Sequence, residues 1–131
     1  MSEESPAIGS IGWIDLTVDD AEGLRDFYAQ VVGWKPAPVE MAGYCDFTMI
    51  EPETLEPAAG ICHARGPNAG LPPQWLIYIV VEDVDHSAAL CVELGGRIVS
   101  EPRLVAGARV CVISDPAGAV CALYQPPPQA A

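Results

Sequence analysis

The chain has 131 residues, half of them hydrophobic, and its 18 acidic and 6 basic side chains give a net charge of -12. A chain of this length is typical of one domain with its own hydrophobic core. Because so few cations are present to neutralise phosphate, duplex nucleic acid and anionic membranes are not expected as partners.

The N-terminus and the cysteines indicate the compartment. Residues 1–10, "MSEESPAIGS", lack the basic and apolar regions of a signal peptide and are expected to form a flexible end. The five cysteines form no CxxC pair and lie among apolar residues, which is typical of buried thiols in a reducing compartment. No apolar run reaches the roughly 18 residues of a membrane helix. We therefore expect a cytoplasmic protein.

The first half of the chain predicts one strand, one helix and three further strands. Residues 12–18 are rich in branched and aromatic side chains, which favours a strand. Asp19 or Asp20 fits the N-cap of the following helix, and Gly33 fits its left-handed end. The helix is expected to bury a face made of Leu24, Phe27, Tyr28, Val31 and Val32. Shorter strands are expected near 35–39, 44–50 and 59–63.

The second half repeats this order of elements. Residues 75–81 predict a strand, and Asp83 or Asp85 predicts the cap of a helix that ends at the glycines 95 and 96. The inward face of this helix is expected to contain Leu90, Cys91 and Leu94. Strands are expected near 97–100, 109–114 and 120–124, and "DPAG" at 115–118 predicts a tight turn between the last two.

Each half therefore predicts a βαβββ module, the first at 11–63 and the second at 74–125. A linker rich in proline and glycine, 64–73, joins the modules, and a flexible end, 126–131, follows them. We expect an α+β fold in one structural domain. In it, the two tandem modules form a cup-shaped, mainly antiparallel mixed sheet around one cleft.

This tandem order resembles the vicinal oxygen chelate superfamily, which includes glyoxalase I, extradiol dioxygenases, fosfomycin-modifying enzymes and bleomycin-binding resistance proteins. The resemblance covers residues 11–125, and its most specific stretches are "DLTVDDAEGLRDFYAQVVGW" and the "DPAGA" hairpin. The chain is most similar to the glyoxalase/bleomycin-resistance-like bacterial members. The resemblance implies one cavity built by the paired modules and, commonly, a homodimer.

Metal-dependent members of this superfamily hold a divalent ion with His and Glu side chains on the cleft-facing strands. The matching positions here carry Trp13, Leu76 and Ala122, and the fourth falls on Cys62 beside His63. A divalent ion needs three or four converging lone pairs, which these side chains cannot supply. We therefore expect no metal and no other cofactor, and we assign no catalytic residue.

Alternation along the strands places a group of side chains on the expected cleft face: Trp13, Asp15, Phe47, Met49, Cys62, Leu76, Tyr78, Ala122 and Tyr124. An aromatic, apolar wall with a few polar tips suits an aromatic or cationic ligand. The alternative is that these side chains only pack the centre of the sheet. Asp15 could anchor a cation, act as a base, or pair with an arginine such as Arg109.

Cys62 and His63 are adjacent strand positions that point to opposite faces, so a thiolate–imidazole couple is not expected. The sequence thus predicts a metal-free protein that binds a small molecule. One alternative is a lyase, isomerase or dioxygenase of the same superfamily with a degenerate metal site. Another is an interaction module whose cleft is filled by its own side chains.

Overall fold

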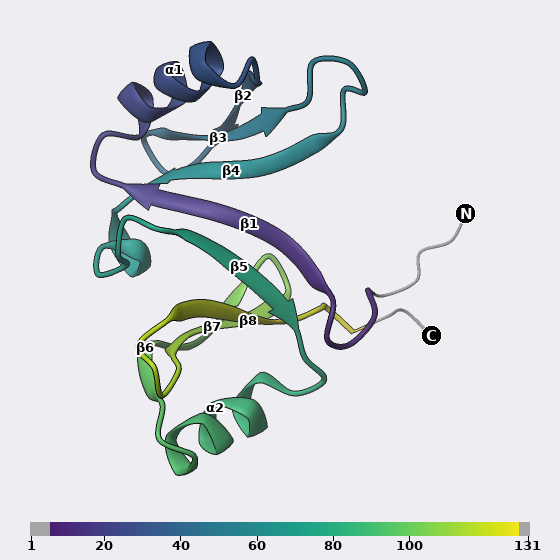
Figure 1. Ribbon diagram of the computed structural model, residues 1–131, viewed down its shortest axis with the longest axis vertical. Helices are drawn as coiled ribbons and strands as arrows, with labels where there is room; N and C mark the ends of the chain where they lie inside the picture. Colours follow the sequence, from purple (N-terminus) through teal and green to yellow (C-terminus); the bar gives the residue numbers. More distant parts are fainter. Residues whose placement is uncertain (1–5, 129–131) are drawn as a thin grey trace. The chain divides into compact units, whose positions relative to one another are not determined.

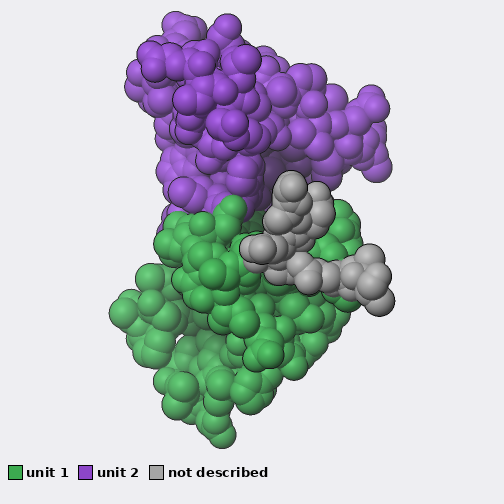
Figure 2. Space-filling view, turned by 90° about the vertical axis from the view of Figure 1, so that its right-hand side faces the viewer, with its two compact units in different colours: residues 1–12, 76–131 green, residues 13–75 purple. Residues whose placement is uncertain are grey.

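A computed structural model describes residues 6–128, and the chain divides into two compact units (Figure 2). Unit 2 contains Trp13–Trp75, and unit 1 contains Met1–Gly12 together with Leu76–Ala131. Within the predicted flexible ends, residues 1–5 and 129–131 lie outside the described part. Gly9 is held in place because its N–H donates to the Val80 carbonyl at 2.7 Å. Among the described residues, no helix is long and apolar enough to cross a membrane.

Unit 2 is built as the first predicted module. Its elements are β1 (Ile11–Val18), α1 (Ala21–Val31), β2 (Lys35–Glu40), β3 (Cys45–Ile50) and β4 (Pro57–His63), followed by a 3-10 turn at Gly66–Asn68. The strand order is β2-β3-β4-β1, with β1 parallel to β4 and the other pairs antiparallel. Helix α1 packs on β2, β3 and β4 (Figure 1).

Unit 1 repeats this arrangement with β5 (Trp75–Val80), α2 (Val84–Glu93), β6 (Arg97–Val105), β7 (Ala108–Ser114) and β8 (Val120–Gln125). The order is β5-β8-β7-β6, and β5 runs parallel to β8. Strand β6 is longer than predicted because its irregular pairing with β7 continues to Val105. The predicted "DPAG" turn is confirmed: Asp115 accepts bonds from two backbone N–H groups, and Gly118 has φ +94°. The α+β class and the two βαβββ modules are therefore confirmed.

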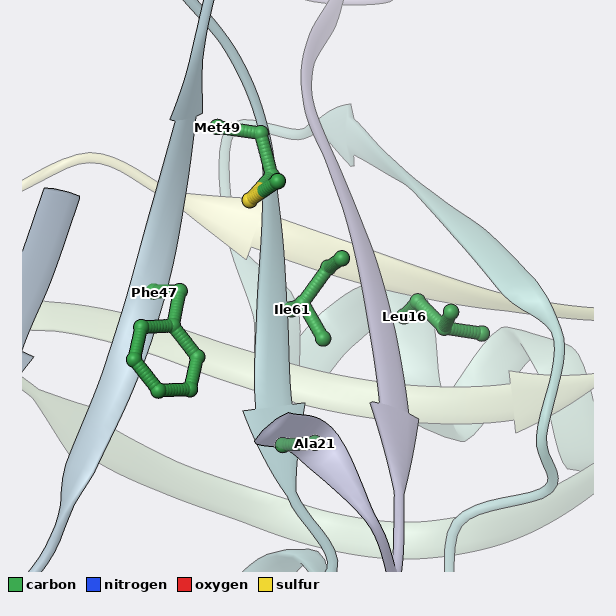
Figure 3. Packing of buried hydrophobic residues seen from close by; sticks show 5 residues of the cluster. All are labelled: Leu16, Ala21, Phe47, Met49 and Ile61. Carbon is green, nitrogen blue, oxygen red and sulfur yellow. The ribbon is translucent and has the colours of Figure 1, made fainter. Parts of the chain in front are cut away.

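The core of unit 2 lies between its sheet and α1. Alternate residues of β1, β3 and β4 point toward the helix, and the pairs Leu16–Ile61 and Phe47–Ile61 align them across the strands. The resulting cluster contains Leu16, Ala21, Phe47, Met49 and Ile61, all at most 5% exposed (Figure 3). This packing identifies which face of the sheet the helix covers.

The predicted buried faces of the two helices are partly wrong. In α1, Leu24 and Tyr28 pack on the core, but Phe27 and Val31 are 53% and 65% exposed. In α2, Val84 and Ala88 reach the core, and the predicted Cys91 also faces the sheet, with its thiol 4.0 Å from the Ser114 carbonyl of β7. The other two predicted residues, Leu90 and Leu94, are 39% and 71% exposed. A helix touches a sheet with one narrow stripe, so the closest approach falls on small residues such as Ala88 and the larger side chains beside it stay outside.

The N-cap of α1 gives a direct test of the helix start. The Asp20 carboxylate accepts a hydrogen bond from the Gly23 N–H at 3.0 Å, which satisfies one of the unpaired donors of the first turn. Asp20→Ala should therefore lower the free energy of unfolding by about 1 kcal/mol. Asp19→Ala removes a neighbouring exposed acid that does not cap the helix. This substitution should change the free energy of unfolding by less than about 0.5 kcal/mol. Urea unfolding followed by circular dichroism measures both, and equal losses would contradict the assignment of the cap.

Candidate functional site

The face of the unit 2 sheet opposite α1 carries several polar side chains. On it, Asp15 of β1 lies beside Gly60 of β4, Thr17 lies beside Cys62, and Gly60 is also paired with Thr48 of β3. Partners in a ladder point to the same side, so these residues share one face. The large apolar residues of the same strands, Leu16, Phe47, Met49 and Ile61, lie on the α1 side.

Trp13 and Asp15 form the clearest contact on this face. The indole Nε1 of Trp13 donates a hydrogen bond to Asp15 Oδ1 at 2.6 Å, and both residues are half-buried. Gly60 makes room for them: a Cβ at this position would overlap Asp15 Oδ1 and would lie 3.3 Å from Trp13 Nε1. An aromatic ring and a carboxylate are thus fixed side by side by the absence of a side chain on the neighbouring strand.

Cys62 lies on the same face, and its thiol is kept protonated. Burial is the main cause that raises the pKa of Cys62, and the charges of Asp15 and Asp46 and a hydrogen bond to Asp46 raise it further. Both carboxylates would repel a thiolate at this position. Cys62 is therefore an unreactive, neutral group beside two acids, and a nucleophilic or metal-binding thiolate is disfavoured.

A second pair, Asp46 and His63, joins β3 to β4, the strand that carries Cys62. Asp46 Oδ1 accepts a hydrogen bond from the His63 backbone N–H at 2.9 Å and lies 3.2 Å from His63 Nδ1. The two side chains are only 9% and 12% exposed. The sequence did not single out Asp46, because the contact depends on the antiparallel register of β3 and β4. One sequence signal could have indicated the Asp46–His63 contact. An acid stands near the start of one apolar strand, and a histidine ends the next strand.

In unit 1, the four predicted cleft residues share one face as expected. Tyr78 is paired with Ala122, and Tyr124 is paired with Val110, while the α2 side of this sheet is occupied by Cys111 and Leu123. Leu76 and Ala122 are buried, and Tyr78 and Tyr124 are half-buried. This face is aromatic and aliphatic, in contrast to the polar face of unit 2.

Two predicted cleft residues lie elsewhere. Phe47 and Met49 are buried and belong to the core cluster of unit 2 (Figure 3). The strand register places Asp15 on the opposite side of the sheet. Phe47 and Met49 do point to the same side of β3, as the alternation predicted. The prediction that this side is the cleft face was wrong. Arg109, which we considered as a partner of Asp15, forms a bidentate pair with Asp85 of its own unit, with N–O distances of 2.7 and 2.8 Å.

The residues at the implied metal positions do not fit a divalent ion. Trp13, Leu76 and Ala122 offer no lone pair for coordination, and the Cys62 thiol is held in its protonated form. Nowhere between residues 6 and 128 do three or more His, Cys, Asp or Glu side chains form a group that could hold a metal ion. We therefore derive no chemical step through a metal.

The raised pKa of Cys62 predicts slow alkylation. At pH 8, Cys62 of the folded protein should react with iodoacetamide at least about tenfold more slowly than the same cysteine in urea, because each unit of pKa lowers the thiolate fraction about tenfold. Peptide mapping by mass spectrometry resolves the individual cysteines, and Cys45, which is also half-buried, serves as the comparison for exposure alone. If Cys62 and Cys45 of the folded protein are alkylated at equal rates, the raised pKa of the Cys62 thiol is contradicted.

Known proteins share both the sequence pattern and the fold. Residues 10–123 match the family described as the Glyoxalase/Bleomycin resistance protein/Dioxygenase superfamily. A Mycobacterium bovis protein named as a provisional glyoxylase, CFP32, is 31% identical over 122 residues, which cover 92% of this chain and 46% of that protein. The anthracycline biosynthesis protein DnrV of Streptomyces peucetius is 33% identical over 85% of this chain and 39% of its own length. The chain thus spans less than half the length of these curated relatives.

Solved structures show the same fold at low identity. A hypothetical protein of Bacillus halodurans, BH1468, matches with a TM-score of 0.58 and 17% identity over 94% of this chain and 98% of its own. The methylmalonyl-CoA epimerase of Mycobacterium tuberculosis matches with a TM-score of 0.56 and 18% identity over 95% of this chain and 93% of its own. At these identities the likeness concerns the fold alone.

Proposed function

We propose a function from the premise that this chain belongs to the Glyoxalase/Bleomycin resistance protein/Dioxygenase superfamily. In the proposal it is a metal-free protein that binds a small aromatic or cationic molecule. The ligand lies against Trp13 and is oriented by Asp15, on the face of the unit 2 sheet that α1 does not cover.

The single observation that carries this proposal is the Trp13–Asp15 hydrogen bond of 2.6 Å on a half-buried face. An indole offers a stacking surface, and an adjacent carboxylate attracts a positive group, so the pair suits an aromatic cation. The net charge of -12 attracts cations to the whole chain. The lack of fitting ligands at the family's metal positions supports binding without a metal.

Matched ligands and matched variants test this proposal. Calorimetry should show that benzamidinium binds more tightly than benzamide, which has nearly the same shape and no charge. Asp15→Asn should weaken benzamidinium binding by about tenfold, the usual loss when a charge-assisted hydrogen bond is removed. Glu40→Gln removes an exposed acid of the same unit and should leave both affinities unchanged. A panel of aromatic cations that all fail to bind the folded protein would remove the basis of the proposal.

The proposal also includes a homodimer in the cytoplasm. The exposed apolar side chains Phe27 and Val31 give an association surface on α1, and all five cysteines are free thiols, as in a reducing compartment. Sedimentation equilibrium tests the oligomeric state: a monomer at micromolar concentration would contradict the dimer without affecting the proposed binding site.

A further inference from the structure

A groove on the α2 side of the unit 1 sheet lies apart from the residues proposed to bind a ligand at Trp13. It has a volume of about 440 Å³, which is within the usual range of sites for small molecules. Asp85 of the first turn and Val92 of the last turn of α2 both line it, so the groove runs along this helix. All of its lining residues belong to unit 1.

Bulges in β6 form one wall of the groove. Between Ile98 and Arg103, β6 takes five steps where its partner β7 takes three, so β6 holds two extra residues. Extra residues in a strand interrupt the ladder and turn their side chains in a new direction. Glu101 and Pro102 belong to this irregular stretch, and both line the groove.

Small side chains on α2 form the opposite wall. Ala88 stands five positions after the capping Asp83, and the same position of α1, counted from its cap Asp20, holds Arg25. The Arg25 guanidinium lies 4.8 Å from the centre of the Phe47 ring and covers it, whereas Ala88 leaves space beside its sheet. The apolar surface of the groove therefore consists of Ala88, Ala89, Val92, Ile98 and Pro102.

The charged end of the groove combines an ion pair with a second acid. Arg109 Nε and Nη2 donate to the two Asp85 oxygens at 2.7 and 2.8 Å, and this hydrogen bonding lowers the pKa of Asp85. Each carboxylate oxygen has a second lone pair, and the Asp85 side chain is 57% exposed. Burial raises the pKa of the Cys111 thiol, and the charges of Glu101 and Asp85 raise it further, so both carboxylates lie near the same buried residue.

The neighbouring cations of β6 do not line the groove. Arg103 donates to Ser100 Oγ at 2.8 Å, and Arg97 stands at the start of the strand. The charged groups that line the groove are Asp85, Glu101 and Arg109. Two carboxylates and one guanidinium give this end a net charge of -1, so it favours a cation over an anion.

We propose that this groove binds an aliphatic primary amine in its ammonium form. The alkyl chain lies along Ala88, Ala89 and Val92 of α2. The ammonium group donates to Glu101 and to the remaining lone pairs of Asp85. Binding removes apolar surface from water, including that of Val92, which is 56% exposed.

The test uses the full chain and hexylammonium, followed by proton–nitrogen NMR at constant ionic strength. Hexylammonium should shift the amide signals of α2 and β6 and bind at least about tenfold more tightly than hexanol, which has the same chain and no charge. Hexanoate, with the opposite charge, should not bind. Methylammonium should cause no saturable shift, and it controls for the general attraction of cations to a chain of net charge -12.

Substitutions at the groove separate its charge from its shape. Glu101→Gln should weaken hexylammonium binding about tenfold. Ala89→Leu places a larger side chain at an exposed helix position that lines the groove, so it should abolish saturable binding and leave the fold intact. Arg109→Gln removes the cation that competes for Asp85, so hexylammonium should bind at least about twofold more tightly. Glu93→Gln removes an acid of α2 that does not line the groove and should leave binding unchanged.

Several outcomes would overturn the proposal. They are equal affinity for hexylammonium and hexanol, equal effects of the Glu101 and Glu93 substitutions, and weaker binding by Arg109→Gln. Shifts that follow the protein concentration instead of the ligand concentration would identify the groove as a contact between copies and would also overturn it. If one variant does not fold, the matched ligands and the other variants still decide the question. Failure here leaves the benzamidinium test unaffected, because Trp13 and Asp15 belong to unit 2 and the groove is lined by unit 1.

Discussion

Replacing Met49 by alanine should lower the free energy of unfolding by about 3 kcal/mol. Met49 is fully buried and belongs to the same core cluster as Phe47 and Ile61 (Figure 3). Removal of its side chain leaves a cavity that the surrounding strands cannot close, since their backbones are fixed by ladder hydrogen bonds. Urea denaturation followed by tryptophan fluorescence measures the loss.

Met41 provides the matched control for this substitution. It belongs to the same unit but is 41% exposed, so Met41→Ala should change the free energy of unfolding by less than about 1 kcal/mol. Benzamidinium affinity of the folded Met49→Ala variant should equal that of the wild type, because Met49 points away from Asp15. A stable Met49→Ala variant with altered affinity would instead support the cleft position that the sequence predicted.

Gly60→Ala should destabilise unit 2 by about 2 kcal/mol and also weaken ligand binding. The new Cβ would overlap Asp15 Oδ1 and would lie 3.2 Å from its Cγ, so Asp15 must leave its place beside Trp13. Displacement of a half-buried carboxylate from its hydrogen bond at 2.6 Å removes the group that orients the ligand. Benzamidinium affinity should therefore fall about tenfold, as in Asp15→Asn.

Gly70 is the matched control for Gly60. A Cβ at Gly70 meets no atom within 4 Å, and its backbone has no positive φ. Gly70→Ala should leave stability within about 0.5 kcal/mol of the wild type, or raise it slightly through the lower entropy of the unfolded chain. If Gly60→Ala is as stable as Gly70→Ala and binds benzamidinium equally well, Asp15 does not occupy the space beside Gly60.

The elements themselves could be predicted because their signals are local. Asp20 and Asp83 cap the helices where the sequence expected one of two acids, and Gly33 adopts φ +89° at the end of α1. Each of these signals involves residues within one turn of each other, so no knowledge of the packing is needed. The order of strands and helices, and therefore the α+β class, follows from them.

The site was predicted only in part because a strand has two faces that look alike in sequence. The alternation correctly grouped Trp13 with Asp15 and Leu76 with Tyr78. It could not decide whether Phe47 and Met49 share the face of Asp15, since in β3 both alternate sets include buried residues, Asp46 as well as Met49. Only the helix that covers one side distinguishes the two sets.

The sequence by itself determined the repeated βαβββ order, the caps and turns, and the absence of suitable ligands at the family's metal positions, because each depends on residue type and short spacing. The tertiary structure decided which sheet face is polar and that Asp46 meets His63 across 17 positions of the chain. It also placed Gly60 so that Asp15 can reach Trp13. These contacts depend on the register of β1, β3 and β4, which is fixed by the packing of Leu16, Phe47 and Ile61 under α1.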